Sequence, residues 1–505
     1  MSSRIFGSGI RRREDPRLIT GAAAYTDDMT LPGMLHAVML RSPHAHAKIT
    51  RIDISRAKTA PGVVAAYTGK DVNLNPMPCA WLPPNSALKI ANYPTCAIDT
   101  VRYVGDIVAF VVADTVAQGY DALELIEVDY EPLPVALDPQ KAMQAGAPQM
   151  HADIPNNLAF QWTVAGGDVD AAFAQAEVTV KERIVQQRLI PNAMEPRAAL
   201  AKWGGMSGEL TLWNTTQNPH ILRYLTSVVT GIAEDKLRVI APEVGGGFGC
   251  KIPAYPGEFL AIFASRKLNR PVKWTETRSE NYQATTHGRA HIQEIELAAK
   301  KDGTILGIRA SSWSAMGAYL STAAPGIPTI LHGLMLSGVY NIPAIKEDVY
   351  GVYTNQTPVE AYRGAGRPEA TFIVERMVDK LATTLNMDPV AVRQKNLIPK
   401  FENGHAVATG LTYDSGDYPG TLKKLLDHVN YDQLRKEQAD ARKNGRIVGI
   451  GVGTYVEICG LGPSQVAAAV GFQGGLWESA IVRVHPTGKV NVFIGASPHG
   501  RGEET

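Results

Sequence analysis

The chain has 505 residues, which is too long for a single hydrophobic core and predicts about two to four domains. Lys and Arg number 50 against 49 Asp and Glu, and this balance argues against a nucleic-acid-binding protein. The longest apolar run, residues 107–113, is much shorter than the roughly 18 residues that span a bilayer, so it predicts a buried strand.

Residues 1–20 are polar and predict a surface arm. The arginines at 11–13 resemble a twin-arginine export signal, but the polar segment 14–17 follows where that signal needs apolar residues. Four cysteines stand far apart and show no paired spacing: Cys79, Cys96, Cys250 and Cys459. We therefore predict a cytoplasmic protein with separate reduced thiols, without a zinc site, an iron–sulfur cluster or a disulfide framework.

Residues 21–135 are predicted to form a first domain rich in strands. Apolar runs predict three strands, over residues 34–40, 63–68 and 107–113. A helix is predicted to start near Thr115, with an apolar inner face: Ala117, Ala122, Leu123 and Ile126.

Residues 136–154 are predicted to be a linker, and residues 155–400 a larger α/β block. Residues 401–505 begin with a stretch rich in Gly, Asp and Asn, which indicates another boundary. A helix is predicted next, with an apolar face formed by Leu422, Leu425, Leu426 and Val429. Two strands are predicted after it, over residues 480–485 and 489–494.

The segment APEVGGGFGCK, residues 241–251, follows an apolar run and precedes a predicted helix. It fails as a dinucleotide fingerprint because Cys250 occupies the third glycine position, and as a phosphate loop because Ile252 follows the lysine. Backbone N–H groups and the positive end of the following helix suit an anionic ligand. A tight strand-to-helix turn without any ligand is the alternative interpretation.

Two further loops with few large side chains also follow extended segments: 360–370 and 495–505. The first of them carries Arg363 and Arg367 beside glycines. This combination suits a planar or phosphate-bearing ligand, because the guanidinium group pairs bidentately where the backbone can be approached closely. The three loops together predict one large ligand that the backbone holds from several sides.

These motifs resemble those of the molybdenum hydroxylases, the xanthine oxidase family. The similar segments are GGGFGCK (245–251), AYRGAGRPEA (361–370), MEPRAAL (194–200), TTQNPH (215–220), DPVAVRQKN (388–396) and SPHGRGE (497–503). Within the family the chain is most similar to large subunits of the carbon monoxide dehydrogenase type, through GGGFGCKIPAYPGEF, TYDSGDYP (412–419) and EICGLGPS (457–464). The resemblance covers nearly the whole chain.

The resemblance implies a mixed fold of the α+β and α/β classes. An α/β hammerhead domain is implied over residues 21–135, a first molybdopterin-binding domain over 155–400 and the start of a second over 401–505. The implied cofactor is a molybdenum centre on a pterin dithiolene, in the cytosine dinucleotide form. No side chain of the protein is implied to ligate the metal directly.

The matching motifs also imply roles for single residues. Gln217 and Phe248 are implied to lie close to the ligands of the metal, Arg363 to face the substrate, and Arg393 to contact the pterin. Backbone or side-chain contacts with the cofactor are implied for five more: Gly246, Gly247, Gly249, Gly500 and Arg501. Arg501 stands where the family usually has a glutamine, so this contact departs from the pattern.

The implied reaction is oxidation of an electron-poor carbon, with water as the oxygen source and a glutamate as general base. Electrons would leave to an iron–sulfur small subunit with [2Fe–2S] centres and to a medium subunit with FAD, in a dimer of heterotrimers. The family's glutamate lies in a Gly-Glu-Pro segment near the end of a longer subunit, and Glu243, Glu360 and Glu457 do not match it. We therefore expect a chain that is carboxy-terminally incomplete, and both inactive and poorly soluble without the missing segment.

Two positions bear on the substrate. Copper-containing carbon monoxide dehydrogenases have a cysteine directly after the arginine of the AYR loop, where this chain has Gly364. Purine-oxidising relatives have a glutamate where this chain has Ile252. An aldehyde or an N-heteroaromatic carbon is therefore the expected substrate.

Three alternatives remain open at this point. The chain can be a carbon monoxide dehydrogenase large chain, or a cofactor-binding fragment with no activity of its own. A thiol-dependent aldehyde dehydrogenase using Cys250 as nucleophile is the third, but the sequence shows no nicotinamide-binding unit to support it.

Overall fold

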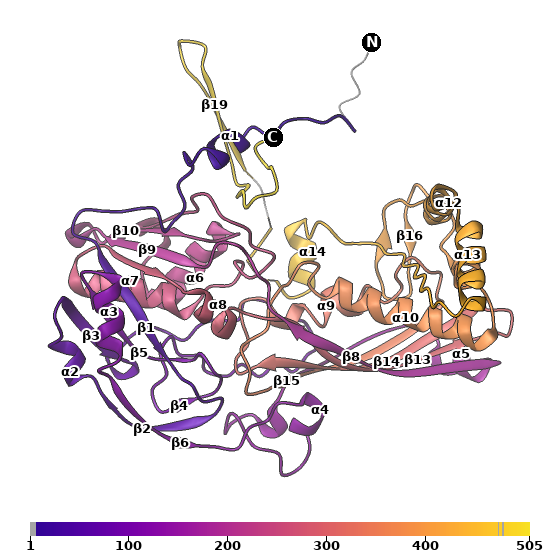
Figure 1. Cartoon of the computed structure of the whole chain (residues 1–505), viewed down its shortest axis with the longest axis horizontal. Helices are drawn as coiled ribbons and strands as arrows, with labels where there is room; N and C mark the ends of the chain where they lie inside the picture. Colours follow the sequence, from indigo (N-terminus) through magenta and orange to yellow (C-terminus); the bar gives the residue numbers. More distant parts are fainter. Residues whose placement is uncertain (1–6, 473, 477–478) are drawn as a thin grey trace.

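Two large β-sheets organise the chain in the computed structural model, which describes residues 7–472, 474–476 and 479–505 (Figure 1). The first sheet has seven strands in the order β11-β10-β9-β12-β1-β5-β3. Their bounds are β1 (Leu35–Arg41), β3 (Val63–Thr68), β5 (Ile107–Ala113), β9 (Ala198–Trp203), β10 (Leu210–Asn214), β11 (Leu237–Ile240) and β12 (Val272–Thr275). Because β1 pairs antiparallel with β5 and parallel with β12, this sheet joins segments from both sides of the predicted linker 136–154.

The amino-terminal strands lie where their apolar runs predict them. The strands predicted over 63–68 and 107–113 are confirmed residue for residue as β3 and β5, and the first strand is shifted by one residue. Every residue of β5 is buried, because the strand lies between β1 and β3 inside the sheet.

Helix α3 (Val116–Leu123) confirms the predicted helix after Thr115. The Thr115 hydroxyl accepts a hydrogen bond from the amide of Gln118 at 3.2 Å, which caps the helix. The prediction that Ala117 faces inward is wrong, since this residue is exposed. Gly119 lies on the inner face instead, where even a Cβ atom would overlap the side chain of Val38.

A small three-stranded sheet completes the amino-terminal part, with the order β4 (Thr100–Val101), β2 (Ala47–Asp53) and β6 (Glu127–Pro132), beside helix α2 (Ser55–Lys58). The segment between β3 and β4 packs against the rest of the molecule, where the ring of Tyr93 stacks on that of Tyr319 at 4.1 Å between centroids. Both rings belong to one large core that spans the two sheets.

The second large sheet has five strands in the order β7-β15-β14-β13-β8. Their bounds are β7 (Leu158–Gly166), β8 (Val178–Leu189), β13 (Gly288–Ala299), β14 (Ile305–Gly317) and β15 (Ala344–Tyr353). The long helix α10 (Arg367–Leu385) lies along one face of this sheet (Figure 1). The spacing of Ile373, Met377, Leu381 and Leu385 in the sequence predicts the apolar face of this helix, and the first three are buried while Leu385 is half-buried.

Helix α7 (Pro256–Leu268) packs against the seven-stranded sheet and is buried over most of its length. The remaining helices before residue 400 are α1 (Asp15–Ile19), α4 (Pro139–Ala142), α5 (Val169–Ala174), α6 (Pro219–Thr230), α8 (Arg278–Ala284), α9 (Ile330–Gly333) and α11 (Pro389–Asn396). Short 3-10 turns occur at 69–71, 155–157, 205–207, 234–236 and 324–326.

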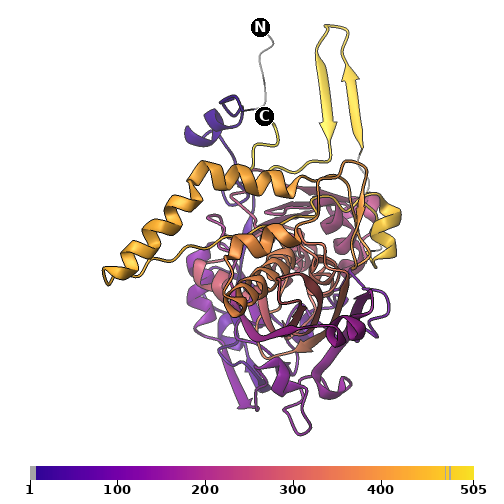
Figure 2. The same ribbon diagram turned by 90° about the vertical axis from the view of Figure 1, so that its right-hand side faces the viewer.

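The carboxy-terminal part consists of α12 (Tyr418–Val429), α13 (Tyr431–Lys443), α14 (Ser464–Ala469), the short pair β16 (His405–Ala406) and β17 (Thr412–Tyr413), and a hairpin of β18 (Ala480–Val484) and β19 (Val490–Ile494). The hairpin projects from the body of the molecule (Figure 2). Both predicted strands are confirmed within one residue, and the predicted helix is confirmed as α12. Only Leu422 of its predicted apolar face is fully buried.

Residues 13–17 lie beside the last two residues of the chain. The Arg13 amide donates to the Thr505 hydroxyl at 2.9 Å, and Arg17 pairs with Glu504. The first six residues of the predicted arm lie outside the described residues. Within the described part of the chain, no helix is long and apolar enough to cross a membrane.

Candidate functional site

The glycine-rich loop between β11 and α7 has an unusual backbone. Gly246, Phe248 and Gly249 have φ angles of 87°, 53° and 99°, in the left-handed region that favours glycine. Phe248 adopts this conformation although it carries a large side chain, which is 41% exposed. Such a residue is rare and persists only where the surrounding structure holds it, so the loop is shaped for close approach.

The side chain of Gln217 holds the loop from one side. Its carbonyl oxygen accepts hydrogen bonds from the amides of Gly249 at 2.9 Å and Lys251 at 3.3 Å. A Cβ atom at Gly247 would lie under 3.0 Å from three atoms of Gln217. In the described part of the chain, the amides of Gly247 and Phe248 have no acceptor. These two N–H groups are therefore free for a ligand.

Glu195 and Lys251 hold the loop from the other side. A carboxylate oxygen of Glu195 accepts from the Gly245 amide at 2.7 Å and from the Lys251 ammonium at 2.9 Å. The Lys251 side chain is only 1% exposed, so this ion pair is removed from water. Sequence reasoning assigned neither residue a role, although both lie in motifs on which the resemblance rests.

The second glycine loop packs backbone to backbone against the first. The Arg363 amide donates to the Phe248 carbonyl at 3.0 Å. A Cβ atom at Gly249 would overlap the Ala361 carbonyl, so only glycine permits this approach. The Arg363 side chain is exposed, and its guanidinium group makes no hydrogen bond or ion pair with any described residue. The neighbouring Arg367 differs, because it donates to Glu457 at 3.0 Å.

The third loop reaches Gln217 through His499, a residue for which the sequence predicted no role. His499 lies with its Nε2 atom 3.4 Å from the side-chain nitrogen of Gln217. Gly500 has a left-handed φ of 98° with open space around it, and Arg501 is 67% exposed and pairs with Glu503 at 2.6 Å. The structure therefore brings the second and third predicted loops to the first one, the second by direct packing on Phe248 and Gly249 and the third through Gln217.

Arg393 lies elsewhere in the fold. Its side chain is fully buried between α10 and α11, where it donates to Glu375 and Asp379, each at 2.8 Å. These two ion pairs account for the residue as part of the packing of the two helices. All three nitrogens of its guanidinium group therefore have partners within these two helices.

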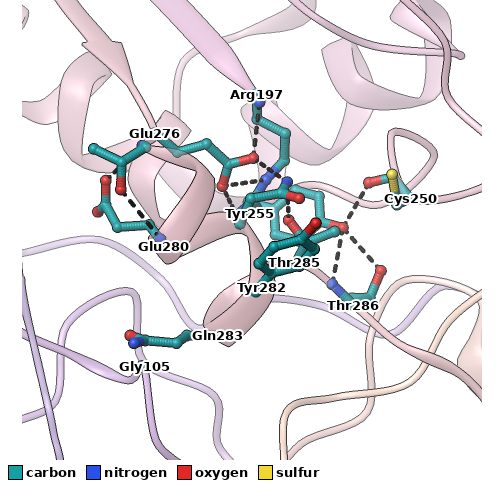
Figure 3. A network of polar contacts seen from close by, with 12 residues as sticks. Gly105, Arg197, Cys250, Tyr255, Glu276, Glu280, Tyr282, Gln283, Thr285 and Thr286 are labelled. Carbon is teal, nitrogen blue, oxygen red and sulfur yellow. Dashed lines mark hydrogen bonds and ion pairs between the residues drawn. The ribbon is translucent and has the colours of Figure 1, made fainter. Parts of the chain in front are cut away.

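A buried polar network supports the end of the first loop (Figure 3). The Arg197 guanidinium group donates to Glu276 at 3.0 Å and lies 3.5 Å above the centroid of the Tyr255 ring. The Tyr255 hydroxyl donates to the Cys250 carbonyl at 2.6 Å and lies 2.8 Å from the Thr286 hydroxyl. A cation–π contact that is screened from water is worth about 2 kcal/mol, so the network fixes the point where the loop turns into α7.

Cys250 is buried, and its Sγ atom lies 3.0 Å from the Gly247 carbonyl. Burial raises the pKa of this thiol to about 11. A raised pKa keeps the thiol protonated until the pH approaches 11, so Cys250 does not supply a thiolate nucleophile near neutral pH. This disfavours the thiol-dependent aldehyde dehydrogenase.

We expect Cys250 to be alkylated much more slowly than the exposed Cys459. Near neutral pH the thiolate fraction of Cys250 is about a hundredfold below that of an ordinary thiol, because the pKa is raised by about two units. Iodoacetamide should therefore label Cys459 in the folded protein and reach Cys250 only after denaturation, as read by peptide mass spectrometry. Labelling of both cysteines at similar rates in folded protein would contradict the assignment.

The three glutamates near the loops all have partners within the fold. Glu243 pairs with Arg17, and Glu457 with Arg367. Glu360 is buried and accepts from the amides of Ala323 at 2.8 Å and Ala361 at 3.0 Å. Burial raises the pKa of Glu360 to about 7. Its hydrogen bonds link two loops, and among the described residues none of the three carboxylates bonds to the free amides.

Profiles of known families match almost the whole chain. The molybdopterin cofactor-binding domain matches residues 150–397 and, with a second profile of the same description, residues 424–505. The hammerhead domain of aldehyde oxidase and xanthine dehydrogenase matches residues 20–134. These matches confirm the predicted fold class and the predicted order of the domains.

Individual proteins are similar over the same range. The chain is 39% identical, over its whole length, to the carbon monoxide dehydrogenase large chain of Afipia carboxidovorans and spans 64% of that protein's length. It is 30% identical to the nicotinate dehydrogenase large molybdopterin subunit of Eubacterium barkeri over 83% of this chain and 95% of that subunit. The solved structure of quinoline 2-oxidoreductase from Pseudomonas putida 86 superposes with a TM-score of 0.93 at 33% identity, over 99% of this chain and 63% of that one.

Proposed function

Because the chain belongs to the xanthine oxidase family of molybdopterin-binding proteins, we propose that it is the cofactor-binding large subunit of a molybdenum hydroxylase. The observation that carries this proposal is that two side-chain-poor loops converge on the glycine-rich loop held by Gln217, which has free amides on Gly247 and Phe248. A planar anionic cofactor fits such a site, because backbone donors approach it without steric hindrance.

The residues present fit a molybdenum–molybdopterin cofactor, and we propose the cytosine dinucleotide form. The loop from Gly246 to Gly249 and the side chain of Gln217 would hold the cofactor close to the metal, and Gly500 and Arg501 would cover it. When bound, the cofactor supplies two-electron redox chemistry with water as the oxygen source. The protein's own part is to orient the substrate and to keep donors fixed around it.

Arg363 is the proposed substrate-facing residue. Its backbone is tied to Phe248, while its guanidinium group is exposed and free of partners among the described residues. A guanidinium group that has no protein partner and stands on a fixed backbone can donate two parallel hydrogen bonds to acceptor atoms of a planar substrate. The exposed Phe248 ring adds an apolar surface beside it.

We propose that the general-base glutamate comes from residues outside these 505. Glu243 and Glu457 each pair with an arginine, and Glu360 is buried with two backbone amides donating to it, so none of the three is presented beside the free amides of the site. We also propose that the electrons leave to partner subunits that carry [2Fe–2S] centres and FAD, in a cytoplasmic dimer of heterotrimers. The alternative of a cofactor-binding chain without activity of its own shares the same site.

An aldehyde or an N-heteroaromatic carbon is the proposed substrate. Two relatives act on N-heteroaromatic compounds by name, quinoline and nicotinate. Carbon monoxide is the second candidate, because the large chain of a carbon monoxide dehydrogenase shares 39% identity. Gly364 argues against it: this position has no thiol for copper, its φ is 102°, and a Cβ atom there would overlap the ring of Pro368.

Metal and nucleotide analysis of the protein, purified together with its bound partners, tests the proposal. We expect molybdenum, CMP released by acid, no stoichiometric copper, and faster oxidation of quinoline or benzaldehyde than of carbon monoxide. Protein without molybdenum would contradict the cofactor assignment. Stoichiometric copper with efficient oxidation of carbon monoxide would instead favour the second candidate.

Replacing Arg363 by alanine tests its role in substrate binding. We expect kcat/KM to fall by the equivalent of roughly 2–4 kcal/mol, because charge-assisted hydrogen bonds to the transition state are lost. Molybdenum content should stay unchanged. The matched control is Arg446→Ala, an exposed arginine outside the loops, which should alter neither quantity. Loss of molybdenum in Arg363→Ala would place this residue among the cofactor contacts instead.

A further inference from the structure

Arg289, the second residue of β13, has a backbone conformation that residues other than glycine rarely adopt. Its φ is 62° and that of the next residue, Ala290, is 66°. Two consecutive non-glycine residues in the left-handed region are costly, and the surrounding structure must hold them there. Neither residue belongs to a tight hairpin turn, since both lie within β13, so local turn chemistry does not explain the conformation.

The side chain of Arg289 points to the second glycine loop. Its guanidinium group donates to the carbonyl of Tyr362 at 2.8 Å and to that of Arg363 at 2.9 Å. The group also lies 4.7 Å from the centroid of the Tyr362 ring. One planar cation therefore bonds to two successive carbonyls of the loop and also lies over the ring of Tyr362.

A buried carboxylate completes this arrangement. Glu369 is fully buried and pairs with Arg289 at 3.3 Å. The other oxygen of Glu369 accepts from the Gly366 amide at 2.9 Å, at the end of the loop where α10 begins. The Arg289 side chain is only 13% exposed; its contact with the Tyr362 carbonyl is partly buried, and its contact with the Arg363 carbonyl lies at the surface.

The main chain of Arg363 is consequently fixed on both sides. Its amide donates to the Phe248 carbonyl of the first loop, and its carbonyl accepts from Arg289 on β13. The start of β13 also packs directly on the loop, because a Cβ atom at Gly288 would overlap that of Tyr362. Only the side chain of Arg363 remains free to reach a ligand.

We propose that Arg289 is a positioning residue, whose strained backbone aims its guanidinium group at the loop and thereby sets the direction of the Arg363 side chain. The substrate-facing role of Arg363 rests on the proposed function, whereas the grip on the loop does not. Arg289 itself is not proposed to contact substrate or cofactor. It acts on the reaction through Arg363.

Hydrogen exchange of the purified protein tests the grip without any activity assay. Arg289→Lys keeps the positive charge beside Glu369 but loses the planar fork, in which separate nitrogens reach the two carbonyls. We expect the amides of residues 363–366 to exchange at least about tenfold faster in this variant, while the strands of the seven-stranded sheet keep their protection. The matched control is Arg309→Lys on the neighbouring strand β14, where an exposed arginine pairs with Glu296. It should leave exchange in the loop unchanged.

Unchanged exchange of residues 363–366 in folded Arg289→Lys would overturn the proposal, and so would equal loosening of the whole protein. A second measurement needs no variant. Phenylglyoxal should modify the free Arg363 well before Arg289 in wild-type protein, because the Arg289 guanidinium group is occupied. The reverse order would also overturn the grip.

Kinetics of the holoenzyme with quinoline or benzaldehyde test the link to Arg363. If Arg289 acts through Arg363, Arg289→Lys should lower kcat/KM at least about tenfold in the wild-type background and much less in Arg363→Ala. Independent, additive effects would show that Arg289 does not act through Arg363. Absence of turnover in wild-type protein with bound molybdenum would contradict the proposed substrates, and the exchange result would still decide the grip.

Discussion

Gly247→Val is expected to leave the protein folded but with little or no bound molybdenum. A Cβ atom at this position already lies under 3.0 Å from Gln217, so a valine must push that side chain away. Gln217 would then lose its hydrogen bonds to the Gly249 and Lys251 amides, and the valine would fill the space beside the two free amides. Gly247 itself does not have a left-handed φ, so the effect comes from the side chain and not from backbone strain.

Metal content of the purified variant is the measurement, with circular dichroism to verify the fold. Gly449→Val is the matched control, because a Cβ atom at Gly449 meets nothing within 4 Å and its φ is also outside the left-handed region. This control should retain wild-type molybdenum. A folded Gly247→Val protein with full molybdenum content would refute the assignment of the loop to the cofactor.

Arg197→Met is expected to lower the free energy of unfolding by about 3–5 kcal/mol, because it leaves the carboxylate of Glu276 buried without a cation. Both side chains are almost completely buried, at 2% and 0% exposure. Burial alone would raise the pKa of Glu276, but attraction to Arg197 and hydrogen bonds outweigh it and lower the pKa. The pair therefore stabilises the wild-type protein above the unfolded-state pKa of a glutamate, and this stability is lost as the pH falls through the lowered value.

Urea denaturation gives the free energy, and Arg223→Met is the matched control. Arg223 pairs with Glu234 at 3.4 Å on the surface, where an ion pair is worth about 0–1 kcal/mol. The double variant Arg197→Met/Glu276→Gln should recover much of the lost stability, since no buried charge remains. A loss in Arg197→Met no larger than in the control would show that the network does not support the loop.

Local patterns were sufficient to predict the secondary structure around the site. The apolar run over 107–113 becomes a fully buried strand, and the spacing of Ile373, Met377 and Leu381 becomes the buried face of α10. Both depend on hydrophobic periodicity, which neighbouring residues in the chain set by themselves. The prediction that Ala117 faces inward was wrong, because the face of a helix that is buried also depends on which strand packs against it.

The contacts that build the site could not be predicted in the same way. Gln217 meets the amide of Gly249 across 32 positions of the chain, and His499 across 282. Arg197 and Glu276 are 79 residues apart. Arg393 lay in a matching motif, yet the structure commits its guanidinium group to Glu375 and Asp379. Pairings over such separations depend on sheet order and loop packing.

The sequence by itself determined the mixed α/β class, the order of the domains and the three glycine-rich loops, because periodicity, composition and motifs are local properties of the chain. Only the tertiary structure decided that the other two loops converge on the loop held by Gln217, that Arg363 stays free while Arg367 is paired, and that Arg289 bonds to the second loop. The left-handed backbones of Phe248 and Arg289 show the physical reason. Neither residue prefers that conformation, so the packing of distant segments must impose it.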